Sequence, residues 1–325
     1  MRVLVTGGAG YIGSVLSRRL LEAGYDVRVV DKLMFGVEPV KELVGDSHFE
    51  IQIGDIMNYS DMARALKGVD AVMHLASIVG DPACAAEPDT ATETNLMSTL
   101  RLSRLCREKK IERFVFASTC SVYGASEGDS EITETSPLNP VSLYAETKID
   151  CEKVLLAFNS GGFSPTILRL GTLYGLSPRM RFDLVVNYLT WKAHAQKKIK
   201  IFNGEVWRPF VHVGDIASAF LKVLEAPSDK VAFQTYNVGF TDENYRLKRL
   251  GELIAENVPG TQVEYLSETK DQRSYRVSFA KFEKAFGLKK TKTLAEGVRE
   301  TKAALESGAF PDPSSWKYNN YIPWG

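Results

Sequence analysis

The sequence contains little cysteine and histidine, and neither residue type is clustered. Four residues of each are scattered through 325 residues, without CxxC pairs and without the spacing of a zinc site. We therefore expect no disulfide framework and no metal centre.

An excess of charge of one sign and a long apolar run are also missing. Forty basic residues balance 40 acidic residues, which gives no electrostatic footprint for nucleic acid or an anionic membrane surface. No apolar stretch reaches the roughly 18 residues of a membrane-spanning helix, and no leader segment precedes the first apolar run. These absences predict a cytoplasmic protein that acts on a small molecule.

Short apolar runs alternate with helix-like stretches through the first half of the chain. Parallel strands need crossover connections and helices on both faces, so this alternation predicts an α/β fold with a doubly wound parallel sheet of the Rossmann type. Its ligand belongs at the carboxyl ends of the strands. The runs lie at residues 2–5, 27–30, 49–53, 71–74, 114–117 and 166–170.

A glycine-rich segment follows the first of these runs, at residues 5–13 (VTGGAGYIG). Glycines in such a loop permit a tight turn, let the backbone approach a pyrophosphate, and let the next helix pack on its strand. A helix-like pattern then continues to Gly24, and the second apolar run ends at Asp31. This unit predicts a dinucleotide site with the anion at the helix N-terminus.

Asp31 indicates which dinucleotide the site takes. Its carboxylate can accept hydrogen bonds from the ribose diol of NAD, and it repels the 2′-phosphate of NADP. The neighbouring Lys32 weakens that repulsion slightly. A solvated turn carboxylate is the alternative interpretation of Asp31, but in this context we predict NAD as the cofactor.

The chain changes character after about residue 174, where scattered charges and aromatic residues become more frequent. A chain of this length exceeds one typical domain. We expect an NAD-binding Rossmann domain at 1–172 plus about 211–239. A smaller C-terminal α/β substrate domain would comprise about 173–210 plus 240–325, with the ligand in a cleft between the two.

Tyr144 and Lys148 place a phenol and an ammonium four residues apart, on one face of a helix. A neighbouring ammonium and an oxidised nicotinamide both favour the phenolate, so Tyr144 can act as a base. Alone, the spacing is typical of an ordinary packing pair. The hydroxyls that follow the apolar run ending at Ala117 strengthen the prediction, because one of them can share a substrate proton with Tyr144.

These residues resemble those of the extended short-chain dehydrogenase/reductases, and within them the sugar-nucleotide epimerases and dehydratases. The resemblance covers nearly the whole chain. It is carried by the glycine loop, Asp31, Gly54-Asp55-Ile56, His74-Leu75-Ala76-Ser77, Asn95, the hydroxyl motif before Val122-Tyr123-Gly124, Tyr144 with Lys148, and Arg208-Pro209-Phe210-Val211.

The resemblance implies roles for three catalytic residues and for a set of cofactor contacts. Thr119 matches the hydroxyl that hydrogen-bonds the reacting hydroxyl of the substrate, Tyr144 matches the base, and Lys148 matches its activator and a ligand of the nicotinamide ribose. With the loop and Asp31, the cofactor set comprises Gly7, Gly10, Tyr11, Ile12, Gly13, Asp31, Lys32, Asp55, Ile56, Leu75, Ala76, Ser77, Asn95, Ala117, Tyr144 and Lys148.

Three of these cofactor residues have equally simple structural interpretations. Asp55 and Ile56 match a segment that contacts adenine, but a turn carboxylate and a core side chain would look the same. Asn95 matches a position near the cofactor, and a buried helix-capping amide is its alternative.

The substrate contacts implied by the resemblance are Thr119, Thr172, Arg208 and Arg273. Arg208 matches an arginine that clamps the nucleotide diphosphate, for which a guanidinium fork is well shaped. Thr172 stands where related epimerases often have an asparagine, so the grip on the diphosphate is altered. Arg273 lies near a position where many relatives contact the nucleotide, and an exposed, solvated arginine is the alternative.

Cys120 departs from the pattern of a typical sugar-nucleotide 4,6-dehydratase. Such enzymes have an aspartate and a glutamate directly after the threonine, whereas this chain has Cys120 and Ser121. The usual acid and base are therefore missing. A thiol can still serve as an acid, which makes Cys120 a candidate catalytic residue, and a small side chain packed behind Thr119 is the alternative.

The leading hypothesis is an NAD-dependent epimerase of a nucleoside-diphosphate sugar. The sugar would be oxidised transiently to a keto-sugar, and the hydride would return to its other face. A dehydratase that uses Cys120 as acid is the runner-up, and a non-catalytic NAD-binding sensor and a simple carbonyl reductase are further alternatives. The resemblance also suggests a homodimer that forms through helices around residues 95–107 and 144–158.

Overall fold

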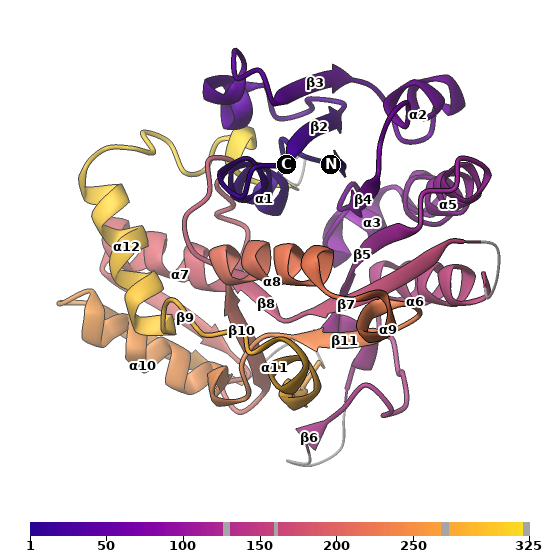
Figure 1. Ribbon diagram of the computed structural model, residues 1–325. Helices are drawn as coiled ribbons and strands as arrows, with labels where there is room; N and C mark the ends of the chain where they lie inside the picture. The colour runs from indigo at the N-terminus through magenta and orange to yellow at the C-terminus, as the bar shows by residue number, and fades with distance from the viewer. Residues whose placement is uncertain (126–130, 159–161, 268–272, 321–325) are drawn as a thin grey trace.

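A seven-stranded parallel sheet forms the centre of the molecule. The computed structural model describes residues 1–125, 131–158, 162–267 and 273–320. The strand order is β11-β7-β5-β4-β1-β2-β3 (Figure 1), which confirms the expected doubly wound sheet, and each apolar run named above is one of its strands. The strands are β1 (Arg2–Thr6), β2 (Asp26–Asp31), β3 (Phe49–Ile53), β4 (Ala71–His74), β5 (Arg113–Thr119), β7 (Ser164–Leu170) and β11 (Thr235–Val238).

The strands are apolar on both faces because helices cover both. Side chains alternate along a strand, so Val3 and Val5 face one core cluster and Leu4 faces the other. The first cluster includes residues of α1 (Tyr11–Glu22), α8 (Val213–Glu225) and α11 (Ala280–Phe286). The second includes residues of α2 (Tyr59–Ala65), α5 (Ser98–Glu108) and α6 (Leu143–Leu156).

Smaller sheets and three helices build the second half of the molecule. Figure 1 shows α7, α10 and α12 gathered around β9 and β10, away from α2 and α5. β10 pairs with β8 and β12, and so lies outside the seven-stranded sheet. The elements are β8 (Thr172–Tyr174), β9 (Lys198–Phe202), β10 (Trp207–His212), β12 (Asn244–Arg246), β13 (Gln262–Leu266), α7 (Val185–Gln196), α10 (Leu247–Asn257) and α12 (Leu294–Glu306).

Short elements complete the connections. Within the described ranges, none of the helices is long and apolar enough to cross a membrane. The division into two domains at the boundaries given above stays a prediction. The short elements are α3 (Asp81–Ala86), α4 (Pro88–Thr92), a π-helix (Glu93–Met97), α9 (Ser228–Val231), the paired β6 (Glu131–Ile132) and β14 (Arg276–Val277), and 3-10 turns at Glu38–Leu43, Cys120–Tyr123, Thr241–Glu243 and Trp316–Tyr318.

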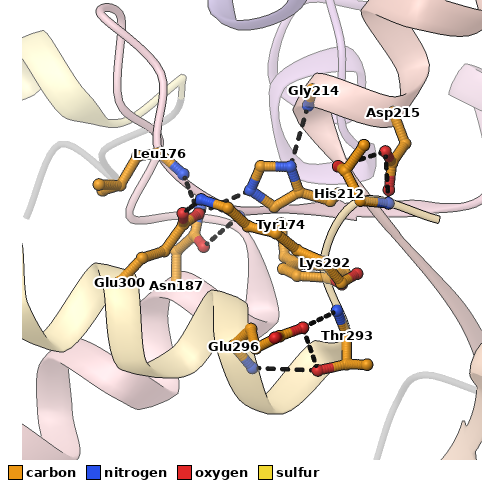
Figure 2. Close-up of polar contacts among 12 residues, drawn as sticks. Tyr174, Leu176, Asn187, His212, Gly214, Asp215, Lys292, Thr293, Glu296 and Glu300 are labelled. Carbon is orange, nitrogen blue, oxygen red and sulfur yellow. Dashed lines mark hydrogen bonds and ion pairs between the residues drawn. The ribbon is translucent and has the colours of Figure 1, made fainter.

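A buried polar cluster joins the three-stranded sheet β12-β10-β8 to helix α12 (Figure 2). His212 ends β10, and its Nε2 lies 2.6 Å from Oε1 of Glu300 on α12. The same carboxylate pairs with Lys292 and accepts a hydrogen bond of 3.0 Å from the backbone N–H of Leu176. Nδ1 of His212 accepts the N–H of Gly214 at 3.1 Å, so Nε2 carries the ring proton.

The neutral ring of His212 makes the cluster sensitive to acid. Burial lowers the pKa of His212 to about 4, and the nearby Lys292 adds to this effect. Because the unfolded histidine titrates near pH 6.5, the unfolded chain binds more protons than the folded chain between about pH 6.5 and 4. Stability is therefore lost as the pH falls through this window.

We predict that the free energy of unfolding falls by about 2 kcal/mol between pH 7 and pH 5 through His212 alone. Urea unfolding of the wild type and of His212→Gln at both pH values checks this. The variant should be less stable at pH 7 but should show a flatter pH dependence. Equal pH slopes for the two proteins would contradict a buried neutral His212.

Candidate active site

The glycine loop joins β1 to α1 at the carboxyl edge of the sheet, and its close contacts explain its glycines. Gly7 has φ +70°, and a Cβ there would lie 2.9 Å from the backbone of Ala76. A Cβ at Gly13 would lie 2.2 Å from the carbonyl oxygen of Gly7. Gly10 precedes α1 as its N-cap, and no described side chain caps this helix. The first N–H groups of α1 therefore fit an anion such as the pyrophosphate of a dinucleotide.

Asp31 ends β2 beside this loop. Its Oδ2 accepts the N–H of Ala9 at 3.0 Å, and its Oδ1 accepts the N–H of Leu33 at 2.8 Å. Two carboxylate oxygens have about four acceptor sites, so Asp31 can still bind ribose hydroxyls. Lys32 forms an ion pair of 3.0 Å with Asp55. Because Lys32 is paired with Asp55, its charge offsets less of the repulsion between Asp31 and the 2′-phosphate of NADP than expected.

Other residues predicted to bind the cofactor near the loop form hydrogen bonds and core contacts within the protein. Tyr11 donates its hydroxyl proton to the carbonyl of Gly175 at 2.7 Å. Asp55 accepts the N–H of Met57 at 2.9 Å, as a turn carboxylate does, and Ile56 is a buried member of the second core cluster. Ile12 packs against the first core cluster. Contacts of these side chains with the cofactor stay predictions.

A chain of hydrogen bonds fixes the segment after β4. The Oγ1 of Thr6 accepts the N–H groups of Leu75 and Ala76, both at 3.2 Å. It lies 2.7 Å from Nδ1 of His74, whose Nε2 lies 2.9 Å from Oγ1 of Thr99. Thr99 gives its one proton to a backbone carbonyl. His74 must therefore donate from Nε2 and accept at Nδ1, and burial lowers its pKa to about 3, so the ring stays neutral.

Asn95 ties this segment to helix α6. Its Oδ1 accepts the hydroxyl of Ser77 and the N–H of Ile78, both at 2.8 Å. Its Nδ2 donates to the carbonyl of Ile78 at 3.0 Å and to Oγ1 of Thr147 at 3.3 Å. The amide is buried and its oxygen and nitrogen each have two partners. This placement favours the interpretation of Asn95 as a buried structural amide, and its place near the cofactor stays a prediction.

The three predicted catalytic residues lie together at the end of β5. Tyr144 and Lys148 are on α6, and the side chain of Thr119, the last residue of β5, lies close enough to the phenol of Tyr144 to lower its pKa. The ammonium of Lys148 is buried, lies 5.8 Å from the centre of the Tyr144 ring, and donates to the carbonyl of Ala117 at 3.0 Å. Ser118 instead donates to the buried Glu152 at 2.5 Å, so Thr119 is the hydroxyl of this strand end that lies near Tyr144.

The charges around Tyr144 differ from those expected. Burial raises the pKa of Tyr144, and the strongest opposing cation is Arg181 rather than Lys148. Burial lowers the pKa of Lys148 to about 8, so this residue is itself a weakened cation. The role of Lys148 as activator of Tyr144 stays a prediction. Arg181, whose charge lowers the pKa of Tyr144, forms an ion pair of 2.6 Å with Asp183.

The predicted substrate arginines lie side by side. Arg208 is buried, donates to the backbone carbonyl of Arg273, and lies over the Tyr275 ring at 5.2 Å. Arg273 forms an ion pair of 2.6 Å with Asp81 of α3. Thr172 is the half-buried first residue of β8, in register with Phe210. Binding of a diphosphate by these residues stays a prediction.

Cys120 lies behind Thr119 in the protein core. Only 1% of its surface is exposed, and Sγ lies 3.4 Å from the carbonyl oxygen of Arg169. Burial raises the pKa of the thiol, which makes it a poor proton donor. These observations favour the packing interpretation of Cys120 over a role as catalytic acid.

Sequence reasoning missed three charged residues near the site. Arg181 and Asp81 both act electrostatically on Tyr144, and Arg179 acts on Asp31. The two arginines come two residues apart in the segment SPRMRFD, which begins three residues after the end of β8. That alternation was the available signal, because residues after a parallel strand face the ligand edge of the sheet.

Comparison with known proteins agrees with this geometry. Residues 3–239 match the NAD-dependent epimerase/dehydratase family. Over 260 residues the chain is 34% identical to the uncharacterised UDP-glucose epimerase YtcB of Bacillus subtilis, and the match covers 76% of this chain and 79% of that protein.

Two solved structures have nearly the same fold. The UDP-glucose 4-epimerase of Thermotoga maritima, solved with UDP-glucose, has a TM-score of 0.85 at 27% identity and covers 95% of this chain and 100% of its own. DesIV, a dTDP-glucose 4,6-dehydratase of Streptomyces venezuelae solved with NAD, has a TM-score of 0.85 at 26% identity. It covers 97% of this chain and 100% of its own.

We predict that Gly13→Ala disrupts the loop, whereas Gly24→Ala does not. The first change forces a Cβ against backbone and should cost about 2–3 kcal/mol of stability and abolish NAD binding. The second is a matched control. Gly24 has φ +83°, and a Cβ there would meet no atom within 4 Å, so only about 1 kcal/mol of backbone strain is added. Urea unfolding and NAD titration measure both effects. Tight NAD binding by Gly13→Ala would contradict the assigned loop.

Proposed function

The chain belongs to the NAD-dependent epimerase/dehydratase family, and from that membership we propose that it is an epimerase of a nucleoside-diphosphate sugar. One observation carries the proposal: the phenol of Tyr144 and the side chain of Thr119 lie together at the carboxyl end of β5. A phenol and a hydroxyl at this edge can together bind and deprotonate a sugar hydroxyl. Relatives named as UDP-glucose epimerases support the substrate class.

The reaction requires proton transfer at Tyr144. NAD, when bound, supplies the acceptor and later the donor of the hydride. Thr119 orients the reacting hydroxyl, and Tyr144 removes its proton and returns it after the keto-sugar has turned over. Arg181 favours the phenolate by its charge, against the effect of burial. Lys148 holds the end of β5 through the carbonyl of Ala117, and its ammonium lies 5.8 Å from the centre of the Tyr144 ring.

The surroundings of Thr119 support epimerisation over dehydration. Loss of a sugar hydroxyl needs an acid beside it. The two positions after Thr119 are Cys120, whose thiol is buried against the Arg169 carbonyl, and Ser121, whose hydroxyl lies 3.5 Å from that of Tyr275. Neither is a carboxylate. Transient oxidation and return of the hydride need only the proton of Tyr144, which fits the groups that are available.

We predict that Tyr144→Phe slows epimerisation by about 10²- to 10⁴-fold, because the base is lost. NAD-loaded protein is incubated with UDP-, dTDP-, GDP- and CDP-sugars, and the epimer is followed by NMR. Tyr188→Phe is the control, since Tyr188 is an exposed tyrosine of α7 and should keep the full rate. Absence of an epimer with all four nucleotide classes, together with identical behaviour of Tyr144→Phe and wild type, would refute the proposal.

Cys120→Ala tests the alternative of dehydration. If the thiol only packs behind Thr119, the variant should keep turnover close to that of the wild type, and the product should have the same mass as the substrate. Mass spectrometry of the product and thermal unfolding of the variant check this. Loss of water from the sugar that disappears in Cys120→Ala would instead identify a dehydratase.

A further inference from the structure

The segment that leaves β8 is fastened to the first turn of α1. Ser177 donates its hydroxyl to the carbonyl of Tyr11 at 2.7 Å, and its Oγ lies 3.1 Å from that of Ser14. The N–H of Arg179 reaches the same oxygen at 3.3 Å. Because the first turn of α1 is where the glycine loop presents its N–H groups, Arg179 is held beside the predicted pyrophosphate position.

The guanidinium of Arg179 is buried without a full set of partners. Only 3% of the residue is exposed, and Cζ lies 3.7 Å from the centre of the Phe35 ring. Within the described part of the chain, Nε and Nη2 have no hydrogen-bond partner. Asp183 and Asp31 act on Arg179 through space but form no hydrogen bond with it: Asp183 pairs with Arg181 at 2.6 Å, and Asp31 accepts the backbone N–H groups of Ala9 and Leu33.

The two unpartnered atoms indicate the kind of ligand. Nε and Nη2 form one edge of the guanidinium plane, and such an edge donates two parallel hydrogen bonds to a phosphate or carboxylate. Phe35 lies against the flat face, so it leaves the edge in position for in-plane contacts. A buried guanidinium whose N–H groups lack hydrogen bonds is costly, which makes an incoming anion with two acceptor oxygens the natural partner.

We propose that the Nε–Nη2 edge of Arg179 binds the diphosphate of NAD opposite the N-terminus of α1. Asp31 lies on the same side and serves the adenosine ribose, whereas Arg208 and Arg273 lie together by Tyr275 and α3. The cofactor diphosphate is thus held from two sides, by backbone N–H groups of α1 and by a side chain of the segment after β8. Closure from both sides also fits an enzyme that keeps its cofactor through each turnover.

Titration calorimetry of protein freed of nucleotide tests this contact without any sugar turnover. Arg179→Met should weaken ADP and NAD by about 10- to 100-fold and leave adenosine unchanged, because only the first two carry a diphosphate. Arg179→Lys should lie between, since it keeps the charge and loses the fork. Arg18→Met is the matched control: Arg18 lies on α1, the helix that receives the pyrophosphate, and pairs with Glu42, and its loss should not change ADP affinity.

Two further measurements keep the result interpretable. Arg179→Met without nucleotide should be at least as stable as the wild type, because the change removes a buried guanidinium with two N–H groups that lack hydrogen bonds. UDP binding to the NAD-loaded protein should be unaffected. Equal losses for adenosine and ADP, a loss confined to UDP, or no loss at all would each overturn the assignment. None of these outcomes depends on which sugar the enzyme converts.

Discussion

The hydroxyl of Thr6 begins the hydrogen-bonded chain on which the carboxyl edge of the sheet depends. It holds the backbone after β4, continues through His74 and Thr99, and so reaches the backbone of Asn95. Each threonine has a single proton, so the direction of every bond in the chain is fixed. Breaking any member would leave a buried donor or acceptor unpaired, at a cost of about 1–3 kcal/mol.

Asn95 connects the hydrogen-bonded segment after β4 to helix α6, which carries Tyr144 and Lys148. Its amide bonds both the segment after β4 and Thr147, which lies between Tyr144 and Lys148 on α6. The glycine loop packs on the same segment, since Gly7 lies against Ala76. The cofactor loop and the proton-transfer residues therefore share one rigid support, as hydride and proton transfer at one carbon require.

Local features of this architecture were predictable from the sequence, whereas contacts between distant segments were not. Strand runs, the glycine loop and the position of Asp31 follow from short-range patterns, and the structure has them where expected. The electrostatics of Tyr144 could not be predicted, because the helical spacing to Lys148 is visible in the sequence but burial and the approach of Arg181 are not. The Asp81–Arg273 ion pair likewise joins residues far apart in the chain.

The segment after β8 contributes side chains both to the predicted cofactor site and to the surroundings of Tyr144. Met180 and Phe182 are fully buried in a cluster with Tyr11, which leaves the alternate residues Arg179 and Arg181 to face the ligand edge. Arg179 then acts beside Asp31 and Arg181 beside Tyr144. Since Ser177 ties the segment to α1, the two guanidinium groups keep a fixed spacing relative to the helix that receives the pyrophosphate. Cofactor binding and the charge that favours the phenolate are thereby set by the same few backbone contacts.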